Sequence, residues 1–297
     1  MVENNSRRSG GRSARKALRA APLSKEMRPI KPGMESKTYQ PLNKQGMIKI
    51  HTAALDALEQ IGFGEVPETG KEILTNAGAI MGDDGRIRFP RALVEDMIAK
   101  AAKEITLFGR NPDNDMQIGG ERVYYGTAGA AVHLVDVEKN EYRECYVQDL
   151  FDAAKIVNAL DNVHFLQRPM VCRDIPDNYE MDLNTIYACT RGTTKHVGAS
   201  FTEPGFVKGA FDLLHEIAGG EKQWRERPFV SNSNCFVVPP MKFAMESCQV
   251  MEECVRGGMP ILLLSAGQAG ATAPAPIAGA IVQAVAECLA GLVYVNA

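Results

Sequence analysis

Four short polar clusters hold the residues best suited to bind a ligand, and each cluster directly follows an apolar run. They are Gln167-Arg168, Ser200 to Glu203, Asn232 to Asn234, and Ser265 to Gln268. Amide and hydroxyl groups orient a small molecule, and Arg168 can hold a carboxylate on it. No Ser-His-Asp or Cys-His pair with a convincing arrangement accompanies them. The clusters therefore predict binding and positioning of a ligand, without a nucleophile from this chain.

The spacing of the apolar runs indicates which elements carry these clusters. Strands are predicted to begin at residues 163, 196, 229 and 261, which are 33, 33 and 32 residues apart. Strand-helix units of this length cannot pair as hairpins and need crossover connections, so we expect a parallel sheet. The periodicity between and after the strands predicts helices over residues 179–190, 205–218, 241–256 and 276–292.

Two architectures contain such a parallel sheet with right-handed connections: an open doubly wound sheet and a closed (β/α)8 barrel. No strand is followed by the G-x-G-x-x-G turn of a dinucleotide-binding sheet. In a barrel, all four polar clusters would share the C-terminal mouth, where barrel enzymes keep their sites. We therefore predict an α/β fold, a TIM (β/α)8-type barrel that is truncated after about five strand-helix units, counting a strand near residue 131.

Three regions are predicted along the chain. Residues 1–45 are rich in Gly, Ser and Pro, with ten Lys/Arg and three Asp/Glu before residue 38, and we expect a disordered basic tail. Residues 46–130 are expected to form a helical and β region that packs on the barrel. Residues 131–297 are expected to form the barrel, incomplete at its C-terminal end, beginning with a hairpin whose tip is Lys139-Asn140.

The charge and cysteine patterns bear on several classes of protein. Residues 38–297 carry 23 Lys/Arg and 33 Asp/Glu, whereas nucleic-acid binding needs a clustered basic surface. We expect no nucleic-acid partner, and a weaker hypothesis leaves such a contact to the basic tail alone.

The seven cysteines are scattered without a C-x-x-C pair, which is typical of reduced thiols in a cytoplasmic protein. We expect a cytoplasmic protein without a bound metal.

One stretch, residues 273–297, is apolar enough to be considered as a membrane span. Gln283 and Glu287 are its only strongly polar residues, and a central Glu is costly in lipid. The run is also rich in Ala, Gly and Pro, so we expect a helix buried between protein layers and no membrane. Its apolar face needs a cover that the truncated barrel does not supply, and we therefore expect a homo-oligomer.

Several segments, taken together, resemble one known family. They are LFGRNP (107–112), YYGTAGAAVHLVD (124–136), TTKHV (193–197), VVPPMKFAMESCQVMEECVRGGMPI (237–261) and GATAPAPIAGAIVQAVAECLAGLV (270–293). The sequence is similar to the trimethylamine methyltransferase family of corrinoid-dependent methyltransferases, in unbroken order over roughly residues 47–297. The Ala-rich segment after residue 269 and the basic tail look more like the branch of that family that lacks pyrrolysine.

This resemblance implies a TIM barrel that moves a methyl group from a methylated amine to the Co(I) of a separate corrinoid protein. The branch with pyrrolysine takes trimethylamine, and the branch without it takes quaternary amines such as glycine betaine. The family's corrinoid is carried by a partner protein, so we expect no cofactor bound directly to this chain. The nucleophile would be Co(I) itself, which agrees with the lack of a nucleophile among the polar clusters.

A quaternary ammonium has no N–H group, so a pocket recognises it through aromatic faces and recognises any attached carboxylate through Arg or N–H groups. Tyr124 and Tyr125 are candidates for the cation, with ordinary packing as the alternative. His196 begins its strand, at the end that usually serves stability, so a structural role is the leading expectation and substrate contact the alternative. The predicted substrate-binding residues are Tyr124, Tyr125, Gln167, Arg168, His196, Asn232, Asn234, Gln268 and Thr272.

Two other functions stay open at this stage. A degenerate barrel would bind quaternary amines without turnover, and binding without methylation of cobalt would reveal it. A metal-dependent barrel enzyme acting on a small amine would contain stoichiometric zinc, although the histidines of this sequence lack the spacing of metal ligands.

Overall fold

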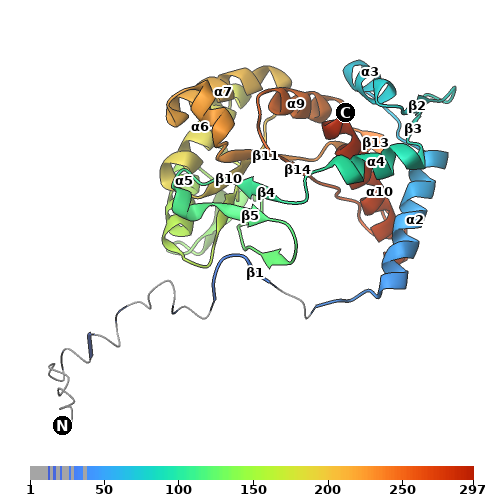
Figure 1. The fold of residues 1–297 in the computed structure, drawn as a ribbon. Coiled ribbons are helices and arrows are strands. Elements are labelled where there is room, and N and C mark those ends of the chain that lie inside the picture. The colour runs from blue at the N-terminus through green and yellow to red at the C-terminus, as the bar shows by residue number, and fades with distance from the viewer. Residues whose placement is uncertain (1–12, 14–15, 18–20, 22–26, 28–29, 36–38) are drawn as a thin grey trace, which may run out of the picture.

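A four-stranded parallel sheet lies at the centre of the structure (Figure 1). This computed structural model describes residues 13, 16–17, 21, 27, 30–35 and 39–297. The strands lie in the order β14-β11-β10-β9, so each is paired with its neighbour along the chain. Their bounds are β9 (Phe165–Gln167), β10 (His196–Ala199), β11 (Val230–Asn234) and β14 (Ile261–Leu263). The predicted parallel sheet is confirmed.

Helices make the connections between these strands: α6 (Asn178–Gly192), α7 (Pro204–Ala218), α8 (Glu221–Glu226) and α9 (Met245–Arg256). Two further helices flank the sheet in sequence, α5 (Val147–Ala159) before β9 and α10 (Ile277–Asn296) after β14. One face of the sheet packs on them, and Leu166, Val197 and Val230 from this face join a buried cluster with Trp224. Parallel sheets are normally covered on both faces, so the opposite face also needs a cover.

The predicted strand near residue 131 does not form. Residues 124–131 run beside β9 with only two isolated parallel bridges, Gly126 to Phe165 and Ala131 to Met170. Within the described residues the parallel sheet therefore has four strands, and a closed barrel stays a prediction. The predicted hairpin does form, from β7 (His133–Asp136) and β8 (Glu141–Glu144), with Asn140 in the left-handed region at φ 54°.

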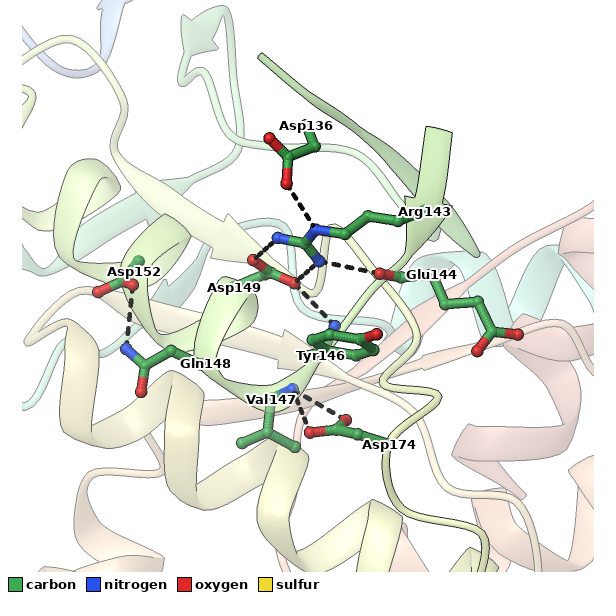
Figure 2. A network of polar contacts seen from close by, with 9 residues as sticks. All are labelled: Asp136, Arg143, Glu144, Tyr146, Val147, Gln148, Asp149, Asp152 and Asp174. Carbon is green, nitrogen blue, oxygen red and sulfur yellow. Dashed lines mark hydrogen bonds and ion pairs between the residues drawn. The ribbon is translucent and has the colours of Figure 1, made fainter. Parts of the chain in front are cut away.

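An ion-pair network fastens this hairpin to the start of α5 (Figure 2). The guanidinium of Arg143 donates to both carboxylate oxygens of Asp149, each at 2.7 Å, and to Asp136 at 3.3 Å. Bidentate pairing of this kind fixes orientation as well as distance. Asp174, from the loop after β9, accepts the backbone N–H of Val147 at 3.1 Å. The hairpin, the helix and the loop are thus held together by three carboxylates.

Helices and short antiparallel ribbons precede residue 130. The helices between residues 44 and 100 are α2 (Lys44–Gln60), α3 (Glu68–Asn76) and α4 (Arg91–Lys100). The short strands are β1 (Met34–Glu35), β2 (Ile80–Met81), β3 (Ile87–Arg88), β4 (Ile105–Leu107), β5 (Met116–Ile118) and β6 (Arg122–Val123). β1 falls within the predicted tail, most of which lies outside the described residues.

A second buried cluster joins this N-terminal region to the end of the chain. Leu58 and Phe63 pack there with Phe243 and Tyr294, and α10 lies against α2 and α4. Figure 1 shows α2 and α4 beside α10 at one end of the sheet. The predicted boundary between residues 130 and 131 stays a prediction, but this core crosses it.

Among the described residues α10 is the one helix that is long and apolar enough to cross a membrane by length and composition. Gln283 and Glu287 in the middle of this helix are nevertheless buried inside the protein, at 8% and 0% exposure. The carboxylate of Glu287 accepts the backbone N–H of Met241 and the amide of Gln283, each at 3.0 Å, and the hydroxyl of Ser265. The helix therefore ties together the loops that follow β11 and β14.

The helix predicted over residues 241–256 begins later than expected, at Met245. The preceding residues form a small hairpin, β12 (Val237–Val238) and β13 (Lys242–Phe243), around Pro239-Pro240. Met241 takes a left-handed φ of 52°, outside the helical region, so the helix begins only after this residue. The short helix α8 has no counterpart in the sequence prediction.

Replacing Glu287 with Leu should lower the free energy of unfolding by about 2–4 kcal/mol, because three donors lose their acceptor and one is a buried backbone N–H. Glu287→Gln should cost less, since its amide oxygen can still accept while the Ser265 hydroxyl accepts from its NH2 group. Urea denaturation of both variants checks this. Equal loss of stability in the two variants would contradict it.

Candidate functional site

A cavity of about 700 Å³ lies against the sheet face that turns away from the helices. We call this face the inner face; it is formed by Phe165, Gln167, His196, Gly198, Ser231, Ser233 and Leu262. Residues of the β4–β5 ribbon line the other side of the cavity. The residues that line it are Ile105, Leu107, Met116, Ile118, Arg122, Tyr124, Phe165, Gln167, His196, Gly198, Ser231, Gly258, Met259, Pro260, Ile261 and Leu262.

Alternation along the strands decides which residues reach the cavity. Phe165 and Gln167 of β9 flank Leu166, which is fully buried on the helix side. His196 and Gly198 of β10 lie in register with them and share the inner face. The predicted substrate-binding residues do not include Phe165, Gly198, Ser231 or Ser233, because position at a strand end does not tell which face of the sheet a residue occupies. The two-residue alternation of each strand is the signal that identifies them.

The side chain of Gln167 extends from β9 over the neighbouring strand β10. Its side-chain Oε1 accepts the hydroxyl hydrogen of Ser233 on β11 at 2.8 Å. Gly198 on the intervening strand makes this possible, because a Cβ at that position would clash with Oε1 of Gln167. The Nε2 group of Gln167 donates to no acceptor among the described residues. The amide therefore has a fixed acceptor end and a donor end without a protein partner.

His196 is part of the cavity wall and is 1% exposed. Its Nδ1 lies 2.8 Å from the carbonyl of Phe108, and its Nε2 lies 3.0 Å from the hydroxyl of Ser231. A carbonyl only accepts, so Nδ1 carries the proton and Nε2 accepts from Ser231. Burial lowers the pKa of His196 to about 4. The ring is therefore neutral near pH 7, with both nitrogens engaged.

Tyr124 also lines the cavity, from the segment beside β9. Its hydroxyl oxygen accepts the backbone N–H of Gln117 at 3.1 Å. Arg122, the one charged residue of the lining, pairs with Glu104 at 2.6 Å and donates to the carbonyl of Gln117. Tyr125 does not line the cavity and is 63% exposed.

Three other predicted residues lie on the helix side of the sheet. Asn232 and Asn234 alternate with the inner-face serines, and Asn234 donates to Oδ1 of Asn232 at 3.0 Å and to the carbonyl of Ser247 at 2.9 Å. Arg168 directly follows β9 and alternates with Gln167, which places it on the same side of the sheet as Leu166. Their predicted contact with substrate stays a prediction.

Gln268 and Thr272 lie in the loop that follows β14, outside the cavity lining. The backbone N–H of Gln268 donates to the Thr272 hydroxyl at 2.9 Å, which closes the loop on itself. The carbonyl of Thr272 accepts from Gln283 of α10 at 3.0 Å. Of the nine predicted residues, the structure thus brings Tyr124, Gln167 and His196 to the cavity, and leaves the other six elsewhere.

Comparison with known proteins gives this cavity a chemical context. The family model described as "Trimethylamine methyltransferase (MTTB)" matches residues 8–297. The chain belongs to the trimethylamine methyltransferase family. Within this family it is similar to a trimethylamine methyltransferase of Desulfitobacterium hafniense, with 31% identity over 245 residues that cover 82% of this chain and 49% of the relative.

Other members of the family are more distant. The glycine betaine methyltransferase of Desulfitobacterium hafniense strain Y51 is 27% identical over 86% of this chain and 52% of its own length. A trimethylamine methyltransferase of Methanosarcina mazei is 26% identical over 82% of this chain and 50% of its own length. The chain spans about half the length of these curated relatives. The family resemblance read from the sequence is confirmed.

The described residues contain no group of three or more His, Cys, Asp or Glu side chains that could hold a metal ion. No Asp, Glu or Cys lines the cavity. The free groups of the cavity are instead hydrogen-bond donors and aromatic faces, which suit binding and orientation of a small organic molecule.

The buried, neutral His196 should make the protein less stable as the pH falls from about 6.5 towards 4. In this window the unfolded chain takes up a proton that the folded protein excludes, so the free energy of unfolding falls by at most about 1.4 kcal/mol per pH unit, or roughly 3 kcal/mol in total. Denaturant titrations of wild type and His196→Gln at several pH values measure this. If the two proteins lost stability in parallel, the assignment would be wrong.

Proposed function

We propose that this protein transfers a methyl group from a methylated amine, bound in the inner-face cavity, to the Co(I) of a corrinoid carried by a separate protein. The observation that carries the proposal is the family match over residues 8–297. The printed names of its relatives describe methyltransferases acting on trimethylamine and on glycine betaine. The corrinoid is here a second substrate delivered by a partner, and no residue of this chain is assigned to hold it.

The reaction breaks the bond between nitrogen and the methyl carbon, and the amine leaves with that electron pair. The acceptor provides the pair for the new bond, so the chain itself needs no nucleophile and no residue that carries the methyl group. Its task is to hold the methyl carbon in one orientation, which can supply a large part of a rate enhancement. A cavity without Cys, Asp or Glu in its lining is consistent with this division of labour.

Two aromatic rings meet the requirement for a cation that has no N–H group. Tyr124 and Phe165 both line the cavity, and the rest of its wall is mainly aliphatic. A trimethylammonium group is attracted to aromatic faces and presents an apolar surface of methyl groups to Leu and Ile side chains. We infer that the methylated nitrogen lies against these two rings.

Phe165→Leu should weaken the binding of glycine betaine roughly 3- to 30-fold, because it removes one aromatic face from the cation and keeps an apolar side chain. Phe206→Leu is the matched control, since Phe206 packs on Tyr179 of α6 and does not line the cavity. Isothermal titration calorimetry measures both. An equal effect of the two substitutions would place the amine elsewhere.

The activity itself is tested by mixing the protein with a corrinoid protein reduced to Co(I) and with glycine betaine or trimethylamine. We expect the Co(I) absorbance to disappear and one equivalent of demethylated amine to form per cobalt. Binding of the amine by calorimetry without any change at cobalt would replace the proposal with an amine-binding protein that has no turnover.

A further inference from the structure

We propose that Arg227 is a positioning residue for the inner-face cavity. It clamps the turn between β4 and β5 (residues 108–115) onto the residues that precede β10 and β11, and through this turn it fixes the ring of His196. The inference rests on the proposed function, since the cavity is the one assigned to the methylated amine. It also gives one shared role to two of the sequence motifs, LFGRNP (107–112) and TTKHV (193–197).

The turn joins the two strands that wall the cavity opposite the sheet. Its Asn114 side chain donates to the hydroxyl of Thr194 at 3.0 Å, and the backbone N–H of Asn111 donates to the carbonyl of Thr194 at 3.2 Å. Gly109 lets the two segments approach this closely, because a Cβ at that position would lie 2.9 Å from the carbonyl oxygen of Thr194. The first motif therefore lies directly against the second. The side chains of β4 and β5 that line the cavity are Ile105, Leu107, Met116 and Ile118.

Arg227 reaches the same turn from the loop between α8 and β11. Its Nη2 group donates to the carboxylate of Asp115, at 2.8 Å from Oδ1 and 3.0 Å from Oδ2, and lies 3.3 Å from the carbonyl oxygen of Gly109. The guanidinium also lies over the ring of Phe108, 4.6 Å from its centroid. Charge-assisted hydrogen bonds and a cation–π contact together favour one orientation of the guanidinium. One side chain therefore holds both ends of the turn.

Phe108 transmits this restraint to the cavity wall. Its carbonyl oxygen accepts from Nδ1 of His196 at 2.8 Å, and Nε2 of the same ring accepts from Ser231 at 3.0 Å. The His196 ring is 1% exposed, so water can replace the carbonyl of Phe108 only if the turn moves away. Release of the turn would free the ring from its single tautomer and would shift the β4–β5 ribbon that lines the cavity.

Arg227 holds the turn from the surface of the protein. Its side chain is 39% exposed, and the side chain of Asp115 is 26% exposed. Ion pairs of this exposure contribute little to stability, so a substitution should release the turn without unfolding the protein. Arg225, two residues earlier, offers a matched control. Its guanidinium donates instead to Glu221 at 2.9 Å and to the carbonyl of Arg256 at 3.3 Å.

Nuclear magnetic resonance of isotope-labelled histidine tests the clamp, with His196→Gln to assign the ring. At about pH 5.5 the wild-type ring should be neutral and protonated only on Nδ1, because burial holds the pKa of His196 at about 4. Arg227→Ala should expose the ring, which raises this pKa by about one unit or more and mixes the two tautomers. Arg227→Lys keeps the charge and loses the planar stack, so it should give a smaller change of the same sign. Arg225→Ala should leave the ring as it is in the wild type.

The methyl-transfer assay then tests the positioning role, with thermal unfolding of each variant as a control for folding. Arg227→Ala should slow transfer roughly tenfold or more at saturating amine, whereas Arg225→Ala should not change the rate. An unchanged His196 ring in Arg227→Ala, equal changes in Arg225→Ala, or a normal transfer rate despite a released ring would each overturn this inference and leave the proposed function intact. A wild type without transfer would overturn the proposed function, and the positioning role with it, even where the ring responds as expected.

Discussion

The alternation of side chains along four parallel strands is the constraint on which the rest of the structure depends. Each strand sends one set of residues to the helices and the other set to the inner face, so a core and a cavity wall are encoded in the same few residues. Leu166, Val197 and Val230 are buried among the helices. Their neighbours Gln167 and His196 face the cavity instead.

Hydrogen bonds that are internal to the protein decide what this cavity can still do. The pairing of His196 with Ser231 and of Arg122 with Glu104 removes the two groups that would otherwise carry charge into it. What remains is a mostly apolar wall, the rings of Tyr124 and Phe165, and the NH2 group of Gln167, which has no acceptor among the described residues. Such a lining binds by shape and by neutral polar contacts, which suits a reaction whose nucleophile is supplied by another molecule.

Much of the architecture could be predicted from the sequence because it depends on local periodicity. The repeat of about 32 residues predicts the order β9, β10, β11 and β14 and their parallel pairing, and the tip at Asn140 follows from turn chemistry. The helix over 241–256 is predicted too long, since the β12–β13 hairpin also depends on contacts with Gly64, which is distant in sequence. The strand predicted near residue 131 is reduced to two isolated bridges, and the local sequence pattern does not predict this difference.

The candidate site was predictable only in part, because position at a strand end does not specify which face a side chain occupies. Gln167 and Arg168 are adjacent, yet the first lines the cavity and the second alternates to the opposite side of the sheet. Asn232 and Asn234 are predicted ligand-binding residues because of their amide groups. The residues that reach the inner face are instead Ser231 and Ser233, which alternate with them along β11. Family membership was recognisable from short motifs, but the hydrogen bonds that engage or free each polar group required the three-dimensional structure.

The most direct measurement is a crystal structure of the protein with glycine betaine. The account predicts that the trimethylammonium group lies in the inner-face cavity, against the rings of Tyr124 and Phe165. Glycine betaine bound instead at the loop of Gln268 and Thr272, with the inner-face cavity free of ligand, would contradict it.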